Sequence, residues 1–135
     1  MRSLAAVLAA LALAPVAGSG KLAAGRVSWV QHGVLTHPGN KGTWTMAGAI
    51  VDKGTFVGVC VKCHGATADL RITYEGKRGT FVLVARILSL HERTRWTLLS
   101  GTGSYRGLHG FGTCVGRLVV NEVSFRDRCK GVFAR

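Results

Sequence analysis

The stretch RWTLLSGTGSYRGLHGFGTCVG, residues Arg95–Gly116, carries the strongest fold signal in this chain. Alternating residues predict a strand at 93–100, and a second strand is expected to begin near residue 110. The glycines around them suit backbone with positive φ, a bulge, or a tight corner where no Cβ fits. The stretch therefore predicts two strands joined by a glycine-rich corner.

The rest of the chain extends this pattern. Apolar residues recur with a period of two, and glycines punctuate the runs. The pattern predicts an all-β sandwich or barrel with eight strands, at about 27–35, 42–51, 54–61, 67–74, 79–89, 93–100, 110–120 and 123–133. The strand at 79–89 is apolar on both faces, so we expect the N-terminal segment, a loop or another subunit to cover its outer face.

Residues Gly101–Thr113, GTGSYRGLHGFGT, resemble the glycine-rich segment of the allene oxide cyclase and dirigent-type barrels, a fold shared by small secreted bacterial proteins. The resemblance implies an eight-stranded antiparallel β-barrel, with an N-terminal segment and first strand at 19–41 and the barrel body at 42–135. It also implies a homo-oligomer, because such barrels are often dimers or trimers. The catalytic pattern of the plant cyclase has no counterpart here beyond the glycine-rich turn, so no catalytic residue is carried over.

The first eighteen residues have the composition of a signal peptide. Arg2 supplies a positive start, residues 4–14 are apolar but too few to span a bilayer, and small residues at 16–18 offer a cleavage site. We therefore expect a secreted, extracellular protein. Its mature part has 17 basic and 6 acidic residues and a net charge of +11. Such an excess favours an anionic surface or ligand, although arginine spread evenly over a soluble protein accounts for it equally well.

Four cysteines in an exported chain are normally oxidised. The sequence Cys60-Val61-Lys62-Cys63-His64 is typical of c-type haem attachment, but its flanks alternate like strands, which favours a Cys60–Cys63 disulfide. A two-residue turn at Asn121-Glu122 would place residue i opposite residue 243 − i, so that Cys114 faces Cys129 and forms a second disulfide. A zinc site would need four well-placed ligands, so we expect no cofactor and no metal.

The same register orders the last two strands. Arg117 faces Arg126, and Arg128 and Lys130 continue an outer patch that either binds an anion or is simply hydrated. Asp127 points the other way, opposite Gly116, and is a candidate ligand contact or general base. The competing interpretations are an ion pair with a buried arginine, Arg71 or Arg86, and a strand bulge that turns Asp127 outward. The candidate ligand-binding residues inside the barrel are Trp44, Tyr74, Trp96 and Asp127, although aromatic residues at strand spacing more often form a core than line a pocket.

We expect a small secreted barrel that binds an apolar or aromatic small molecule. One alternative is an isomerase that guides cyclisation of a reactive intermediate, like the family that the chain resembles. Another is a basic surface-interaction protein with a filled barrel. Specific nucleic-acid binding is not expected, because no aromatic residues are interleaved with the cations of the outer patch. A hollow barrel would favour the first two interpretations over the third, and a polar group placed inside the cavity would favour the isomerase.

Overall fold

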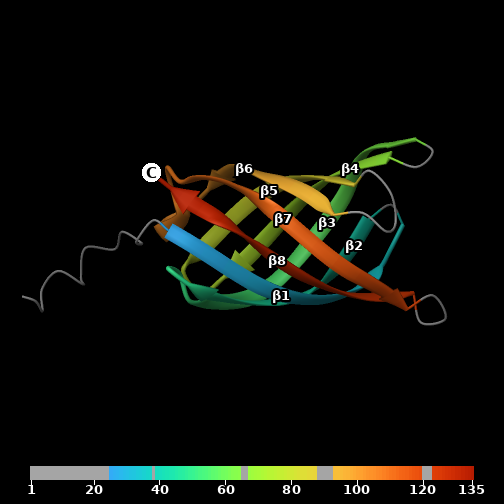
Figure 1. Cartoon of the computed structure of the whole chain (residues 1–135), viewed down its shortest axis with the longest axis horizontal. Coiled ribbons are helices and arrows are strands. Elements are labelled where there is room, and N and C mark those ends of the chain that lie inside the picture. Colours follow the sequence, from blue (N-terminus) through green and yellow to red (C-terminus); the bar gives the residue numbers. More distant parts are fainter. Residues whose placement is uncertain (1–24, 38, 65–66, 88–92, 120–122) are drawn as a thin grey trace, which may run out of the picture.

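The computed structural model describes residues 25–37, 39–64, 67–87, 93–119 and 123–135, which form a closed antiparallel barrel (Figure 1). The predicted signal peptide and the turn at 121–122 lie outside the described residues. Each strand pairs with the next one along the chain, and β1 closes the barrel by pairing with β8. The strands are β1 (Gly25–Leu35), β2 (Gly39–Gly48), β3 (Asp52–His64), β4 (Thr67–Gly76), β5 (Gly79–Ile87), β6 (Thr94–Gly101), β7 (His109–Val119) and β8 (Ser124–Ala134). The predicted eight-stranded barrel is confirmed.

Alternation along each strand decides which side chains enter the barrel. In β5, Phe81, Leu83 and Ala85 are buried, while Val82 and Val84 point outward and are half-buried. Closure leaves no open edge around the wall, since every strand has a neighbour on each side. The expected cover over the outer face of β5 stays a prediction.

Aromatic rings occupy the middle of the barrel. Tyr74 stacks on Phe81 with ring centroids 4.7 Å apart, and Trp29 meets Trp96 at 5.2 Å. The largest fully buried side chains are Trp29, Trp44, Trp96, Tyr74, Tyr105, Phe56, Phe81, Phe133, Met46, Ile50 and Leu83. Edge-to-face and stacked contacts link these rings into one cluster. The barrel is thus packed with side chains along its axis, as in a globular core.

The glycine-rich corner closes one end of the barrel. A short 3-10 helix, η2 (Gly103–Tyr105), follows β6 and turns Tyr105 into the interior, where it is fully buried. Gly103 has a φ of 59°, and a Cβ there would lie 2.6 Å from the carbonyl oxygen of Arg78. This position therefore requires glycine, as the sequence pattern suggested.

Both predicted disulfides are confirmed. Cys60 is bonded to Cys63, and Cys114 is bonded to Cys129 across β7 and β8 with a Cα–Cα distance of 4.0 Å. The pairing of Cys114 with Cys129 follows the predicted register, which also holds from Val119↔Ser124 to His109↔Ala134. In the part of the chain that the structure describes, no helix is long and apolar enough to cross a membrane.

Candidate functional site: a groove on the outer wall

The aromatic residues predicted to bind a ligand belong to the packed interior. Trp44, Tyr74 and Trp96 are 2%, 0% and 2% exposed, respectively. The indole nitrogen of Trp44 donates a hydrogen bond of 2.9 Å to the carbonyl oxygen of Thr55. These rings contact one another and their neighbours, so in this structure their faces are taken up by protein.

Asp127 points inward, opposite Gly116, as the register predicted. Its partner is Gln31, whose Nε2 donates to Asp127 Oδ2 at 2.9 Å. Gln31 Oε1 in turn accepts hydrogen bonds from Trp29 Nε1 at 3.1 Å and from the Tyr74 hydroxyl at 2.6 Å. One buried glutamine therefore joins three strands of the barrel through a chain of polar groups.

The expected arginine partner of Asp127 was wrong. Arg86 lies on the outer wall and pairs with Asp69 at 2.9 Å, and Arg71 is exposed. An arginine at either position alternates to the outside of its strand, whereas Gln31 faces inward on β1. Burial raises the pKa of the Asp127 carboxyl, and the hydrogen bond from Gln31 acts in the opposite direction.

A second inward carboxylate, Asp52, lies at the end of the barrel that the glycine-rich corner closes. It is 6% exposed and accepts hydrogen bonds from the backbone N–H groups of Lys53, Lys77 and Arg78. The Tyr105 hydroxyl donates to the same carboxylate at 2.6 Å. These four donors satisfy both carboxylate oxygens. Asp52 therefore connects η2 to the turn between β4 and β5, which is a structural role.

A groove runs across the outer wall over five strands, from β2 through β1, β8 and β7 to β6. Its floor is a row of inward positions paired from β1 to β6, namely Val27, Gly131, Gly112 and Trp96. The lining residues are Arg26, Val27, Ser28, Gly48, Arg95, Trp96, Thr97, Phe111, Gly112, Thr113, Lys130, Gly131 and Val132, and the volume is about 780 Å³. We call this feature the glycine groove. Figure 1 shows β1, β8 and β7 side by side along this wall.

The side chains on either side of the floor explain the hollow. Ser28, Thr97 and Thr113 are short, so they leave room above the backbone, while Phe111 and the cations form the walls. From the inside, the ring of Trp96 lies against the two glycines, because a Cβ at Gly112 or Gly131 would come within about 2.5 Å of its Cζ2. The glycines thus let an interior indole support a thin part of the wall.

The groove combines an apolar surface with positive charge. Phe111 is 67% exposed and Val132 lies beside it in the paired row, so an aromatic ring and a branched apolar side chain are adjacent on the outer wall. Arg26, Arg95 and Lys130 are exposed on its rim, and no carboxylate is among its lining residues. A groove of this size and composition suits an apolar ligand with an anionic group.

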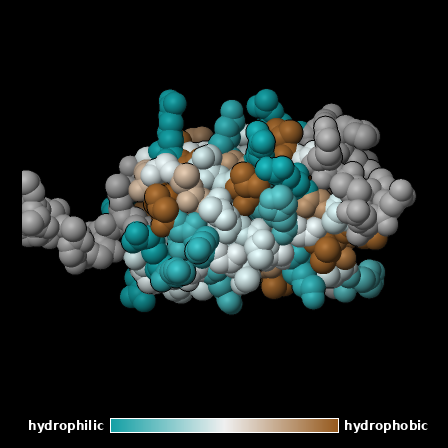
Figure 2. Space-filling view, turned by 90° about the horizontal axis from the view of Figure 1, so that it is seen from below, coloured by the Kyte–Doolittle hydropathy of each residue, from teal (hydrophilic) through white to brown (hydrophobic). Residues whose placement is uncertain are grey.

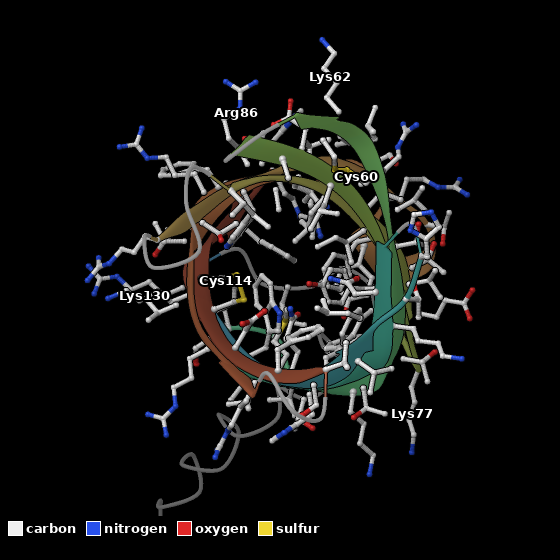
Figure 3. All side chains as sticks on the ribbon, turned by 90° about the vertical axis from the view of Figure 1, so that its right-hand side faces the viewer. Cys60, Lys62, Lys77, Arg86, Cys114 and Lys130 are labelled. Atoms are coloured by element: carbon white, nitrogen blue, oxygen red, sulfur yellow. A yellow bond between two sulfur atoms is a disulfide. The ribbon has the colours of Figure 1, made fainter. Side chains whose placement is uncertain are left out.

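Positive charge dominates the rest of the surface too. Every lysine and arginine whose side chain the structure describes is exposed. Figure 2 shows hydrophilic side chains projecting from the wall between apolar patches, and the labelled Lys62, Lys77, Arg86 and Lys130 point away from the ring of strands in Figure 3. Within the described ranges, Glu75 is the one exposed carboxylate outside the Arg86–Asp69 pair.

The predicted outer patch is placed as expected by the alternation of β8. Arg126, Arg128 and Lys130 are exposed on the outer wall, and Lys130 is shared with the glycine groove. Arg117 is paired with Arg126 in the ladder, and its side chain is outside the described part. The three exposed cations along β8, Arg126, Arg128 and Lys130, make this wall attractive to an anion.

A second hollow of about 520 Å³ lies on β1, β2 and β3. It combines outward residues such as His32, Lys41 and Val57 with the glycines of the Gly33–Gly42 pair. It has a single lysine and no exposed phenyl or indole ring among its lining residues, so it offers less for recognition than the glycine groove.

Comparison with protein-family models, curated proteins and solved structures finds no match. Among the described residues, no group of three or more histidine, cysteine or acidic side chains is placed to hold a metal ion. Sequence reasoning missed the glycine groove. Part of it could have been predicted, because the register that aligns Cys114 with Cys129 also places Gly112 opposite Gly131. The residues that β1 and β6 contribute could not, because no short turn in the sequence fixes how these strands pair with β8 and β7.

Proposed function

We propose that the protein is an exported binding protein for an apolar or aromatic small molecule with an anionic group, and that the ligand binds in the glycine groove. The observation that carries this proposal is the exposed ring of Phe111 next to a cationic rim without carboxylates. The filled interior supports an outer site over an interior one, because the aromatic residues there already contact one another. The apolar N-terminal run and two disulfides support export.

The chemistry of the groove sets the class of ligand. The ring of Phe111 and the methyl groups of Val132 favour an aromatic or branched hydrocarbon body. Arg26 stands at one end of the rim, while Arg95 and Lys130 flank Thr113 in the neighbouring row. Cations on both rows can pair with a carboxylate, sulfonate or phosphate at either end of the ligand. The positive surface around the groove raises the local concentration of such anions.

The resemblance to the allene oxide cyclase and dirigent-type barrels supports an apolar ligand. Catalysis is not part of the proposal, since the described groove offers cations and an apolar wall but no acid–base pair for proton transfer.

The test uses two fluorescent probes of similar apolar size, the anionic 8-anilinonaphthalene-1-sulfonate and the neutral N-phenyl-1-naphthylamine. We expect the folded protein to bind the anionic probe at one site and more tightly than the neutral one. Phe111→Ala should weaken binding of both probes by about tenfold, since burial of part of a phenyl ring stabilises a complex by about 1.5 kcal/mol. Lys130→Gln should weaken only the anionic probe, and this difference should shrink in high salt.

Two matched controls lie outside the groove. Leu99→Ala removes an exposed apolar side chain from β6, and Lys53→Gln removes an exposed cation from β3. Neither change should alter the dissociation constant of either probe by more than twofold. If the groove variants and the controls lose the same amount of affinity for the probes, the probes bind non-specifically and the proposal fails.

A further inference from the structure

The Cys60–Cys63 disulfide lies where the chain leaves the barrel wall. The pairing of β2 with β3 ends at Gly39↔Val59, whereas the pairing of β3 with β4 continues to His64↔Thr67. Among the described residues, β4 is therefore the one strand that pairs with residues 60–64. Figure 1 shows this hairpin projecting past the other strands, and Figure 3 shows Cys60 at the rim of the ring.

A β-bulge brings the two cysteines to the same face. In a regular strand, residues three apart point to opposite faces, so Cys60 and Cys63 could not meet. Here Cys60 pairs with Leu70 and Cys63 with Ala68, two ladder positions apart, and Val61 is the extra residue. The bulge thus has a chemical purpose, because it makes a disulfide possible within the short Cys-x-x-Cys sequence.

The two disulfides differ sharply in access. Cys63 is exposed, and Val61 beside it is 60% exposed, whereas Cys114 and Cys129 are 9% and 2% exposed within the barrel. They also differ in the length of the loop that each closes, because the sequence separation is 3 for Cys60–Cys63 and 15 for Cys114–Cys129. A loop this short constrains the unfolded chain little, so opening it leaves the barrel intact.

We propose that Cys60–Cys63 is a thiol–disulfide exchange site that oxidises dithiols. A thiolate of the partner attacks the sulfur of Cys63, the more exposed residue of the pair, the Cys60–Cys63 bond breaks, and Cys60 leaves as a thiolate that takes up a proton. The second thiolate of the partner then attacks its own sulfur in the mixed disulfide and releases Cys63. The partner loses two electrons and gains a disulfide, and the protein gains them as two thiols. This site is independent of the glycine groove.

The first test follows reduction in the native protein. Reduced glutathione or a short synthetic peptide with two cysteines is added, and the freed thiols are alkylated and identified by mass spectrometry. We expect Cys60 and Cys63 to be modified at least about tenfold faster than Cys114 and Cys129, because access limits exchange. The difference should vanish in guanidinium, and the near-UV circular dichroism should stay native after the fast phase. Equal rates in the native protein would overturn the proposal.

The second test separates the two cysteines and the two sources of thiol. In Cys60→Ser, we expect the remaining Cys63 to form a mixed disulfide with oxidised glutathione, and in Cys63→Ser the half-buried Cys60 should react more slowly. The unmodified protein should oxidise the dithiol peptide with one disulfide formed per chain, faster than oxidised glutathione at equal concentration. A rate no higher than that of glutathione, or an unreactive Cys63 in a variant with a native spectrum, would refute the proposal.

Discussion

Replacement of Gln31 by methionine tests the polar chain inside the barrel. Gln31 is buried and holds Trp29 Nε1, the Tyr74 hydroxyl and Asp127 together through its single amide. Gln31→Met preserves volume but leaves two fully buried donors without an acceptor, at a cost of about 1–3 kcal/mol each. Asp127 is only partly buried and can be hydrated again, and the added apolar surface returns about 1 kcal/mol. We expect a net loss of about 1–5 kcal/mol in the free energy of unfolding.

The matched comparison is Tyr74→Phe, measured in the same way. This change removes one donor, while Gln31 Oε1 keeps its bond from Trp29, so the loss should be near the ordinary hydrogen-bond value of about 0.5–1.5 kcal/mol. Both variants are compared with the unmodified protein by urea unfolding at pH 7 with the disulfides intact. The dependence of the free energy of unfolding on urea concentration should be the same for all three proteins. If Gln31→Met costs no more than Tyr74→Phe, the chain of hydrogen bonds does not stabilise the barrel as described.

The remaining predictions concern ionisation and the buried disulfide. Burial raises the pKa of the hydroxyls of Tyr74 and Tyr105, the only two tyrosines in the sequence. Because the unfolded chain ionises first, the free energy of unfolding should fall as pH rises above about 10, and absorbance at 295 nm should show no tyrosine ionisation until the barrel unfolds. Tyrosine ionisation near pH 10 in a protein that keeps its native spectrum would contradict this. Burial also raises the pKa of Asp127, which makes its ionised form unfavourable in the folded state at neutral pH. Asp127→Asn should therefore be at least as stable as the unmodified protein at pH 7, and lose this advantage below about pH 4; a large loss in urea unfolding at pH 7 would refute it. Replacing both Cys114 and Cys129 by alanine should lower the free energy of unfolding by about 3 kcal/mol for a loop closed over 15 residues, and a loss below 1 kcal/mol in urea would contradict that estimate.

Local rules predicted much of this fold. Alternation located the eight strands, and one assumed turn aligned Cys114 with Cys129 and turned Asp127 inward. These features depend on a single strand or on two strands joined by a short connection, where side-chain period and turn length fix the register.

Contacts between distant strands were not predictable in the same way. The partner of Asp127 is Gln31, which lies 96 residues away on the strand that closes the barrel. An arginine was expected because a charge attracts an opposite charge, but Arg71 and Arg86 alternate outward, and the neutral amide of Gln31 bonds to Asp127 instead. The groove likewise depends on the alignment of β1, β8, β7 and β6 across the wall, which no single stretch of sequence specifies.

The central claim is that ligands bind to the outer wall of a filled barrel, and the three tryptophan indole N–H groups test it directly. In a two-dimensional ¹⁵N NMR titration with 8-anilinonaphthalene-1-sulfonate, we expect the backbone amides of Phe111, Thr113 and Lys130 to shift together with the indole of Trp96, which supports the floor of the groove. The indoles of Trp29 and Trp44 should stay unchanged, since their bonds to Gln31 and Thr55 lie inside the barrel. Shifts at Trp29 and Trp44 without shifts at Phe111 would place the ligand in the interior and contradict the account.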